Sequence, residues 1–146
     1  MSVAALFTWM ATILAGLLLL IIWLMEYDRE YQSGAATRLP VPVISAHALL
    51  GIGGLLLWAV YLLGDEERVA WATVADLGIA ALLGLIMAAR WIRVHRAFTD
   101  PDPSLTRVVT VPPERHFPVP VVVAHGILAV TTIVLVLSTV LVAGQS

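Results

Sequence analysis

The chain repeats one octapeptide: Pro40-Val41-Pro42-Val43-Ile44-Ser45-Ala46-His47 returns 78 residues later as Pro118-Val119-Pro120-Val121-Val122-Val123-Ala124-His125. Each copy opens a long apolar run. Prolines suit the first turn of a helix, where the missing N–H costs nothing and the fixed φ helps. Each copy therefore predicts the start of an apolar helix and places a histidine about a turn and a half inside it.

The composition places the chain among membrane proteins. It has 146 residues, of which 60% are hydrophobic and 12% charged, and a membrane span needs roughly 20 apolar residues in a helix. Four stretches are long enough, and they predict helices at residues 4–25, 42–63, 69–89 and 119–143. We expect the first stretch to be retained, because it lacks the basic flank of a signal peptide. The fold class predicted is all-α, an integral membrane four-helix bundle forming a single transmembrane domain over residues 1–146.

The repeat predicts a tandem duplication of a two-helix hairpin. Both hairpins would start on the same side of the membrane, so a pseudo-twofold axis along the membrane normal would relate them. The helices at 42–63 and 119–143 then become equivalent and lie diagonally across the bundle. The chain has no cysteine, which excludes disulfides, Cys-ligated iron–sulfur clusters and thiol chemistry.

The distribution of arginine predicts the orientation. Every basic residue is arginine, and seven of the eight lie in two connections. These seven are Arg29, Arg38, Arg90, Arg93, Arg96, Arg107 and Arg115. By the positive-inside rule both connections, including a loop at about 94–117, are cytoplasmic, and both termini lie outside the plasma (inner) membrane. The two repeat histidines then lie in the cytoplasmic leaflet.

His47 and His125 are the candidate metal ligands. Neighbouring helices in a bundle are roughly 8 to 10 Å apart, so diagonal helices are about 11 to 14 Å apart, a gap suited to two imidazoles holding one metal centre. Haem b fits, because its iron accepts an axial histidine on each face. Other metals or tetrapyrroles, and histidines that only hydrogen-bond to carbonyls, are the alternatives. Zinc is disfavoured, since two histidines without a third nearby ligand leave it under-coordinated.

Two further sets of residues complete the predicted haem site. Small residues follow each histidine on its own helix stripe and would leave room for a flat ring: Gly51, Gly54 and Ala129. Cations at the cytoplasmic boundary would meet the propionates: Arg38, Arg90, Arg93 and Arg115. The glycines also fit the close helix packing common in membranes. His95 and His116 lie outside the apolar runs, and we expect them to be solvated or to contact propionates.

In outline the chain resembles the small b-type membrane cytochromes, whose helical bundles hold haem between paired transmembrane histidines. The resemblance rests on the histidine-bearing repeat and implies that His47 and His125 are axial ligands. The chain departs from the members with two haems, because it has no second histidine pair in the outer leaflet. It would therefore supply only half of an electron path across the bilayer.

Asp76 is the other candidate functional residue. A row of mostly small residues at four-residue spacing places it inside the bundle: Ala72, Asp76, Ala80, Gly84 and Ala88. Trp71 and Trp91 bracket this helix, as residues at the two membrane interfaces would. An unpaired charge in hydrocarbon is expensive, so Asp76 needs a partner or must be neutral. The candidate partners are Thr8, Thr12, Tyr61, Ser138 and Thr139. Asp76 is either a proton or quinone site or a hydrogen-bonded packing residue.

Three functions are consistent with these patterns. The first is a single-haem electron-transfer protein that exchanges electrons with quinone or a partner redox subunit, as a carrier rather than an enzyme. The second is a structural or accessory subunit of a larger membrane complex, in which the histidines only hydrogen-bond. The third is a small transporter or channel with a proton path through Asp76 and the histidines, which is disfavoured because few polar residues connect the two leaflets. Membrane lipid is an expected partner and a homodimer remains open, whereas nothing predicts nucleic-acid binding.

Overall fold

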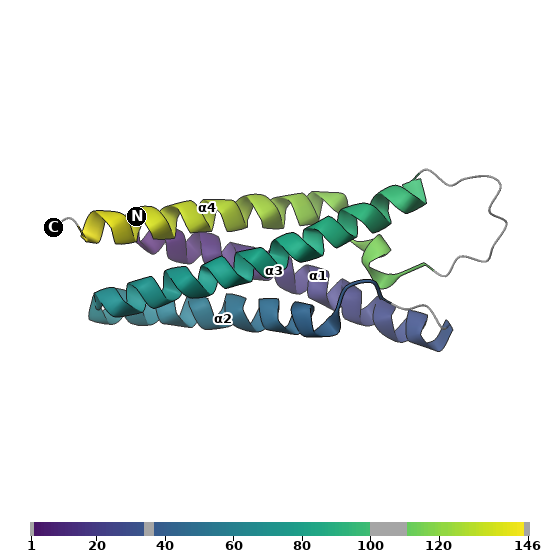
Figure 1. Ribbon diagram of the computed structural model, residues 1–146, viewed down its shortest axis with the longest axis horizontal. Coiled ribbons are helices and arrows are strands. Elements are labelled where there is room, and N and C mark those ends of the chain that lie inside the picture. The colour runs from purple at the N-terminus through teal and green to yellow at the C-terminus, as the bar shows by residue number, and fades with distance from the viewer. Residues whose placement is uncertain (1, 34–36, 100–110, 145–146) are drawn as a thin grey trace.

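Four long α-helices make up most of the chain. The computed structural model describes residues 2–33, 37–99 and 111–144, leaving out the side chains of 28–33 and 98–99. The elements are α1 (Ser2–Ser33), α2 (Val41–Gly64), α3 (Glu67–Thr99), the short 3-10 helix η1 (Pro113–His116) and α4 (Val119–Ala143). All four α-helices are long and apolar enough to cross a membrane (Figure 1). The all-α four-helix bundle predicted from sequence is confirmed.

The repeated octapeptide starts α2 and α4 in the same way. Pro40 and Pro118 precede the helices with φ of −66° and −65°. Their carbonyl groups accept the first helical hydrogen bonds, from Val43 N at 2.9 Å and from Val121 N at 2.9 Å. The proline-rich copies therefore act as matched helix starts, which is why the two histidines that follow lie at matching depths in α2 and α4.

The predicted ends of α1 and α3 were wrong. The apolar runs stop near residues 25 and 89, but α1 continues to Ser33 and α3 to Thr99. Arginine, glutamate and alanine have high helix propensity, so charged residues continue the helices after the apolar runs have ended. The predicted loop at 94–117 consequently begins as helix, and part of its remainder forms η1. Residues 100–110 lie outside the described chain.

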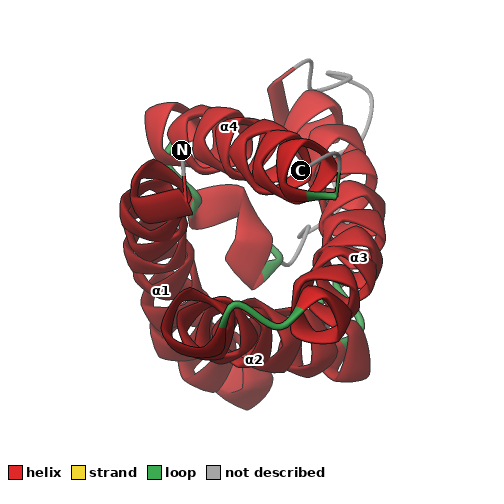
Figure 2. Ribbon diagram, turned by 90° about the vertical axis from the view of Figure 1, so that its left-hand side faces the viewer, coloured by secondary structure: helices red, strands yellow, loops and turns green. Residues whose placement is uncertain are grey.

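The helices form two close pairs around a central space. α2 packs along α3 and α1 packs along α4, whereas α1 meets α2, and α3 meets α4, only sparsely. Seen end-on, α1 lies opposite α3 and α2 lies opposite α4 (Figure 2). Exchanging the two hairpins turns one close pair into the other, so the packing has the twofold relation that the repeat predicts.

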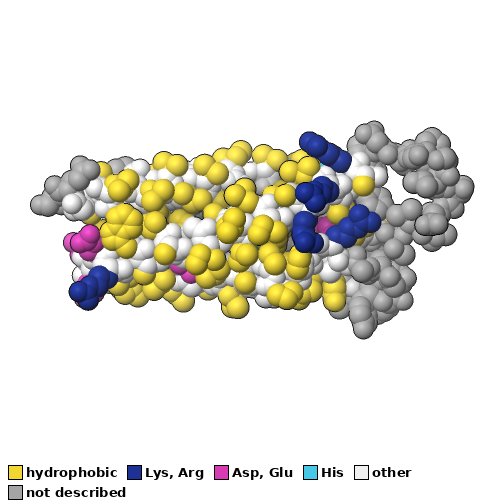
Figure 3. Space-filling view, in the orientation of Figure 1, with side chains coloured by type: hydrophobic (Ala, Val, Ile, Leu, Met, Phe, Trp, Pro, Cys, Tyr) yellow, Lys and Arg dark blue, Asp and Glu magenta, His cyan; other side chains and the backbone are white. Residues whose placement is uncertain are grey.

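The buried core is divided into two layers. One, the terminal core, is near the chain ends and contains Ala5, Trp9, Trp58, Tyr61, Ala70, Val136 and Val140. The other, the arginine-end core, contains Trp23, Leu39 and Ile44. Arginine side chains gather at that end, and apolar side chains cover the bundle's length (Figure 3). The section of the bundle between these layers contains the two histidines.

The 3-10 helix η1 closes the arginine end through a buried carboxylate. Glu114 is fully buried and accepts hydrogen bonds from Thr37 Oγ1 at 3.0 Å and from Arg38 N at 2.7 Å. Thr37 Oγ1 in turn accepts the indole N–H of Trp23 at 3.2 Å. These bonds join the connection before α2 to the segment before α4, and η1 contacts both α1 and α3.

We predict that Gly54→Ala destabilises the bundle by about 1 to 3 kcal/mol, the usual cost of overpacking a tight contact. An added Cβ at Gly54 would meet the carboxyl of Asp76 and, at 2.7 Å, the ring of Trp9. Gly53→Ala is the matched control, because nothing lies within 4 Å of its Cβ position. Thermal unfolding in detergent measures both variants, and equal stability of the two would contradict the prediction.

Candidate functional site

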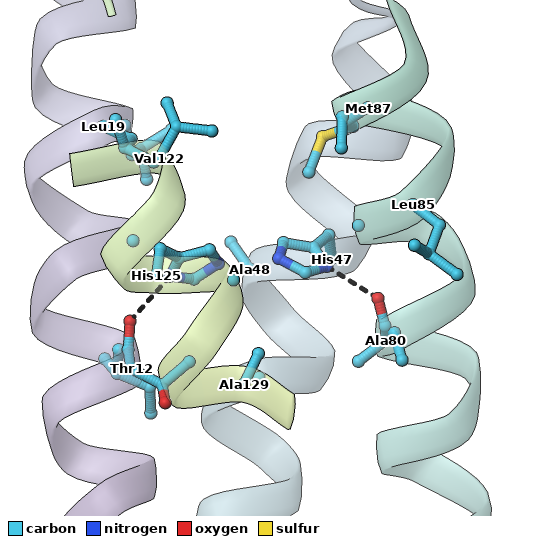
Figure 4. Close-up of a pocket in the computed structure, with 18 of the residues that line it drawn as sticks. Thr12, Leu19, His47, Ala48, Ala80, Leu85, Met87, Val122, His125 and Ala129 are labelled. Carbon is cyan, nitrogen blue, oxygen red and sulfur yellow. Dashed lines mark hydrogen bonds between the residues drawn. The ribbon is translucent and has the colours of Figure 1, made fainter. Parts of the chain in front are cut away.

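A cavity of about 780 Å³ lies between the two core layers and is lined by all four helices. Along α1 its lining runs from Trp9 to Trp23, a rise of about 21 Å in a helix. Apolar side chains make up most of the wall, and the two repeat histidines bring imidazoles into it (Figure 4). The volume is within the range of about 300 to 1,000 Å³ usual for small-molecule sites.

The imidazoles of His47 and His125 face each other across this cavity. His47 Nδ1 is 2.8 Å from the carbonyl oxygen of Ala80 on α3, and His125 Nδ1 is 2.9 Å from that of Thr12 on α1. A carbonyl oxygen can only accept, so each Nδ1 carries the proton and donates it. The two Nε2 atoms point toward each other (Figure 4), and in the described chain neither has a hydrogen-bond partner.

The spacing of the rings suits one atom held between them. The ring centroids are 6.1 Å apart, with the planes inclined by 72°. A bond from imidazole nitrogen to a transition metal is about 2.0 to 2.1 Å long. Two imidazoles on opposite sides of one metal therefore have their nitrogens about 4 Å and their centroids about 6 Å apart. The pair is already close to the separation that a shared metal requires.

Two glycines that the sequence analysis did not assign to the histidine site, Gly16 and Gly84, make room for the imidazoles. An added Cβ at Gly84 would lie 3.0 Å from Cε1 of His47, and one at Gly16 would lie 3.0 Å from Cε1 of His125. At both positions the imidazole therefore packs directly against the glycine, where a larger residue would collide with it. A signal was present in the sequence: Gly16 and Gly84 are 68 residues apart, and so are Trp23 and Trp91. This second repeat marks the first helix of each hairpin.

The small residues predicted from the histidine stripes have different positions. Gly51 and Ala129 line the cavity, and an added Cβ at Gly51 would have nothing within 4 Å. Gly54 is not part of the lining and instead packs against Asp76 and Trp9. Gly54 is seven residues beyond His47 and only about 20° away from it around the helix. It leaves the lining because it lies further along α2, where it packs against Asp76 and Trp9.

The four predicted cations lie outside the cavity wall. None of Arg38, Arg90, Arg93 and Arg115 lines it. The Arg90 guanidinium donates to the carbonyl oxygen of Arg38 at 3.0 Å. Between these arginines and the histidines, the lining contains Trp23, Leu39, Trp91 and Phe117. Of the remaining arginines in the connections, the side chain of Arg29 and the whole of Arg107 are not described.

Asp76 lies next to the terminal core and outside the cavity lining. Its Oδ2 is buried without a hydrogen-bond partner in the described part of the chain. Three of the residues predicted as hydrogen-bond partners of Asp76 donate within their own helices instead. The hydroxyls of Thr8, Thr12 and Thr139 donate to carbonyl oxygens three or four residues earlier. Trp9, whose ring lies close to the same glycine as Asp76, donates its own N–H to Gly51 O at 3.0 Å.

The described residues contain no cluster of three or more His, Cys, Asp or Glu side chains that could hold a bare metal ion. The cavity contains two opposed imidazoles, an arrangement that would suit a metal that brings its other ligands with it. Comparisons with protein-family models, curated proteins and solved structures found no match to this chain. The fold and the cavity define it as an all-α four-helix bundle in which two histidines face one cavity.

We predict that Gly84→Ala perturbs the imidazole of His47 and that Gly16→Ala perturbs that of His125, because each new Cβ forces the ring to shift by a few tenths of an ångström. Nitrogen-15 NMR of histidine-labelled, ligand-free protein should show two Nδ1–H tautomers in the wild type and a changed signal for one ring in each variant. Gly126→Ala is the control, since nothing lies within 4 Å of its Cβ position. Nε2–H tautomers in the wild type would contradict the hydrogen bonds described.

Proposed function

We propose that the chain is a single-haem b-type integral membrane electron-transfer protein, with His47 and His125 as axial ligands between α2 and α4. The observation that carries the proposal is the facing pair of Nε2 atoms on rings whose centroids are 6.1 Å apart. Haem iron takes one axial imidazole on each face. Both lone pairs point to one place, and the carbonyl oxygens of Ala80 and Thr12 hold the rings in that orientation.

The shape of the cavity supports a flat cofactor. The close pair α2–α3 contributes His47 and the close pair α1–α4 contributes His125, and the two pairs touch only sparsely along both sides. A planar ring held by both imidazoles would lie between the two close pairs. Gly51 and Ala129 leave the wall thin next to the histidines, and Gly16 and Gly84 let the imidazoles lie back against α1 and α3.

The chain's own residues would tune the cofactor rather than react with a substrate. Haem with both axial positions occupied by histidine carries one electron and has no open position for oxygen. A ligand imidazole that donates its other N–H to a carbonyl is a stronger base and has a fixed ring orientation, and both histidines have this arrangement. We therefore propose a carrier or accessory redox subunit, not an enzyme in its own right.

The distribution of charge supports an orientation in the plasma (inner) membrane. The arginine end would be cytoplasmic by the positive-inside rule, with both termini outside and the haem in the cytoplasmic leaflet. Quinone or a partner redox subunit would exchange the electron, since the described chain offers one histidine pair at one depth. The sequence predicts that arginines contact the propionates. The four arginines named for this role do not line the cavity, so this contact stays a prediction: Arg38, Arg90, Arg93 and Arg115.

Asp76 stays a candidate proton or quinone site of the same protein. What supports this role is its buried Oδ2, which has no hydrogen-bond partner among the described residues. A carboxyl group that only strengthened helix packing would be expected to hydrogen-bond with a neighbouring helix.

The rival function is an accessory subunit in which the histidines are purely structural. It explains the hydrogen bonds of the two Nδ1 atoms but not the arrangement of the two Nε2 atoms. It explains why each Nδ1 donates to a carbonyl oxygen. It does not explain why both Nε2 atoms face one another in a cavity of about 780 Å³. Structural histidines would gain stability if that space were filled by larger side chains, because protein interiors are otherwise closely packed.

We predict that the detergent-purified protein, either as isolated or after addition of haemin, shows a Soret band and sharp b-type bands on reduction. His47→Ala and His125→Ala should each abolish haem binding or leave the iron five-coordinate. His116→Ala is the control, because His116 is on η1, 3.9 Å from Glu26, and outside the cavity lining. Optical spectra of the oxidised and reduced forms measure all three variants.

Two results would contradict this proposal, the first for haem itself and the second for the two axial ligands. Wild-type protein that stays colourless after incubation with haemin would support the structural rival. Haem bound with an unaltered six-coordinate spectrum in both histidine variants would show that other residues hold the iron.

A further inference from the structure

Trp91 has an indole N–H that the described chain leaves without an acceptor. The other four tryptophans all donate theirs: Trp9 to Gly51 O, Trp23 to Thr37 Oγ1, Trp58 to Ser2 O and Trp71 to Glu67 Oε1. The side chain of Trp91 is 9% exposed, and its Nε1 is buried with no partner among the described residues. The position near a membrane interface that the sequence predicts for Trp91 stays a prediction.

A buried donor without an acceptor is costly. Its lost hydration is worth about 1 to 3 kcal/mol, and a bilayer offers little water to recover it. Such a group in a native protein calls for an explanation, of which an absent ligand is one. Trp91 lines the same cavity as the two histidines. An occupant of that cavity is therefore in a position to supply the acceptor.

The neighbours of Trp91 hold its ring in place. The ring stacks on that of His95, with centroids 5.2 Å apart and planes inclined by 30°. Its counterpart Trp23 stacks in the same way on Tyr27, with centroids 4.8 Å apart and planes inclined by 27°. The two tryptophans thus occupy equivalent positions in the two hairpins. They differ in that Thr37 accepts from Trp23, whereas no described residue accepts from Trp91.

We propose that the Trp91 indole N–H donates a hydrogen bond to a carboxylate oxygen of the cavity ligand and thereby fixes which face of that ligand is turned toward each close helix pair. The inference rests on the proposed function, in which the carboxylate is a haem propionate. A carboxylate is favoured over a neutral carbonyl by the arginines at this end, of which Arg90 directly precedes Trp91. The buried acid at this end, Glu114, already has its acceptors engaged by Thr37 and Arg38.

The difference between the two tryptophans, of which only Trp23 has a hydrogen-bond acceptor in the described chain, would orient the ligand. The histidines and glycines treat the two faces of a planar ligand nearly alike, because the pseudo-twofold exchanges them. Neither the histidines nor the glycines can therefore distinguish the two faces of the ligand. One free indole donor on α3, opposite a satisfied one on α1, distinguishes the two sides. Trp91 is accordingly a positioning residue for the ligand and not a ligand of the metal.

The test measures binding of haemin and of haemin dimethyl ester to the full chain in detergent, by optical titration. Trp91→Phe removes the donor, and Trp23→Phe is the matched control at the equivalent position. We expect Trp91→Phe to weaken haemin binding about tenfold, the scale of one hydrogen bond to a charged group. We expect its effect on the ester to be much smaller, so the preference for haemin over the ester falls in this variant alone. Trp23→Phe should affect both porphyrins equally.

The outcomes separate this inference from the proposed function. If no variant, including the wild type, binds either porphyrin, the haem proposal fails and the role of Trp91 fails with it. If the wild type binds haemin through its histidines but Trp91→Phe keeps the full preference over the ester, only the inference about Trp91 is overturned. Should Trp91→Phe fail to fold, Trp91→benzothienylalanine keeps the ring's shape without the N–H, and the same change in preference is expected.

Discussion

The hydrogen bonds from two imidazoles to carbonyls of neighbouring helices are the interactions on which the rest of this structure depends. An imidazole inside an apolar helix must find a partner within the protein. His47 finds Ala80 on α3, and His125 finds Thr12 on α1. Each bond lies within a close helix pair, so it directs the second ring nitrogen away from that pair and toward the other one. The facing Nε2 atoms and the cavity between them are consequences of how the first nitrogens are satisfied.

The bundle is closely packed at its two ends and contains a cavity in its middle section. The terminal core and the arginine-end core fill the two ends with aromatic and aliphatic side chains. The section around the histidines is lined instead by small residues such as Gly16, Gly51 and Gly84, which contribute little burial and leave a cavity. Glu114 closes the arginine end with hydrogen bonds to Thr37 and Arg38. The fold thus keeps an opening where a purely structural bundle would be packed.

Much of this arrangement could be predicted from the sequence, because the determining signals are local. Proline pairs mark the starts of α2 and α4, apolar length marks four helices, and the repeat marks their diagonal relation. The ends of α1 and α3 could not be predicted from hydropathy, since a helix continues into polar residues that favour it. Gly16 and Gly84 were missed because the repeat of α1 in α3 has a different offset and weaker identity. The burial of Trp91 could not be predicted from the sequence either, because Trp91 lies in the part of α3 beyond the predicted end of that helix.

The pairing of the helices also has a consequence for how the chain is made. His47 and Ala80 are 33 residues apart, whereas Thr12 and His125 are 113 residues apart. Chains emerge from their N-terminus first, so α2 and α3, which a two-residue connection joins, can pair as soon as α3 has been made. α1 must wait for its partner until the last of the four helices is inserted. During biosynthesis the half-site on α2–α3 is therefore complete first, and the cavity closes only when α4 arrives beside α1.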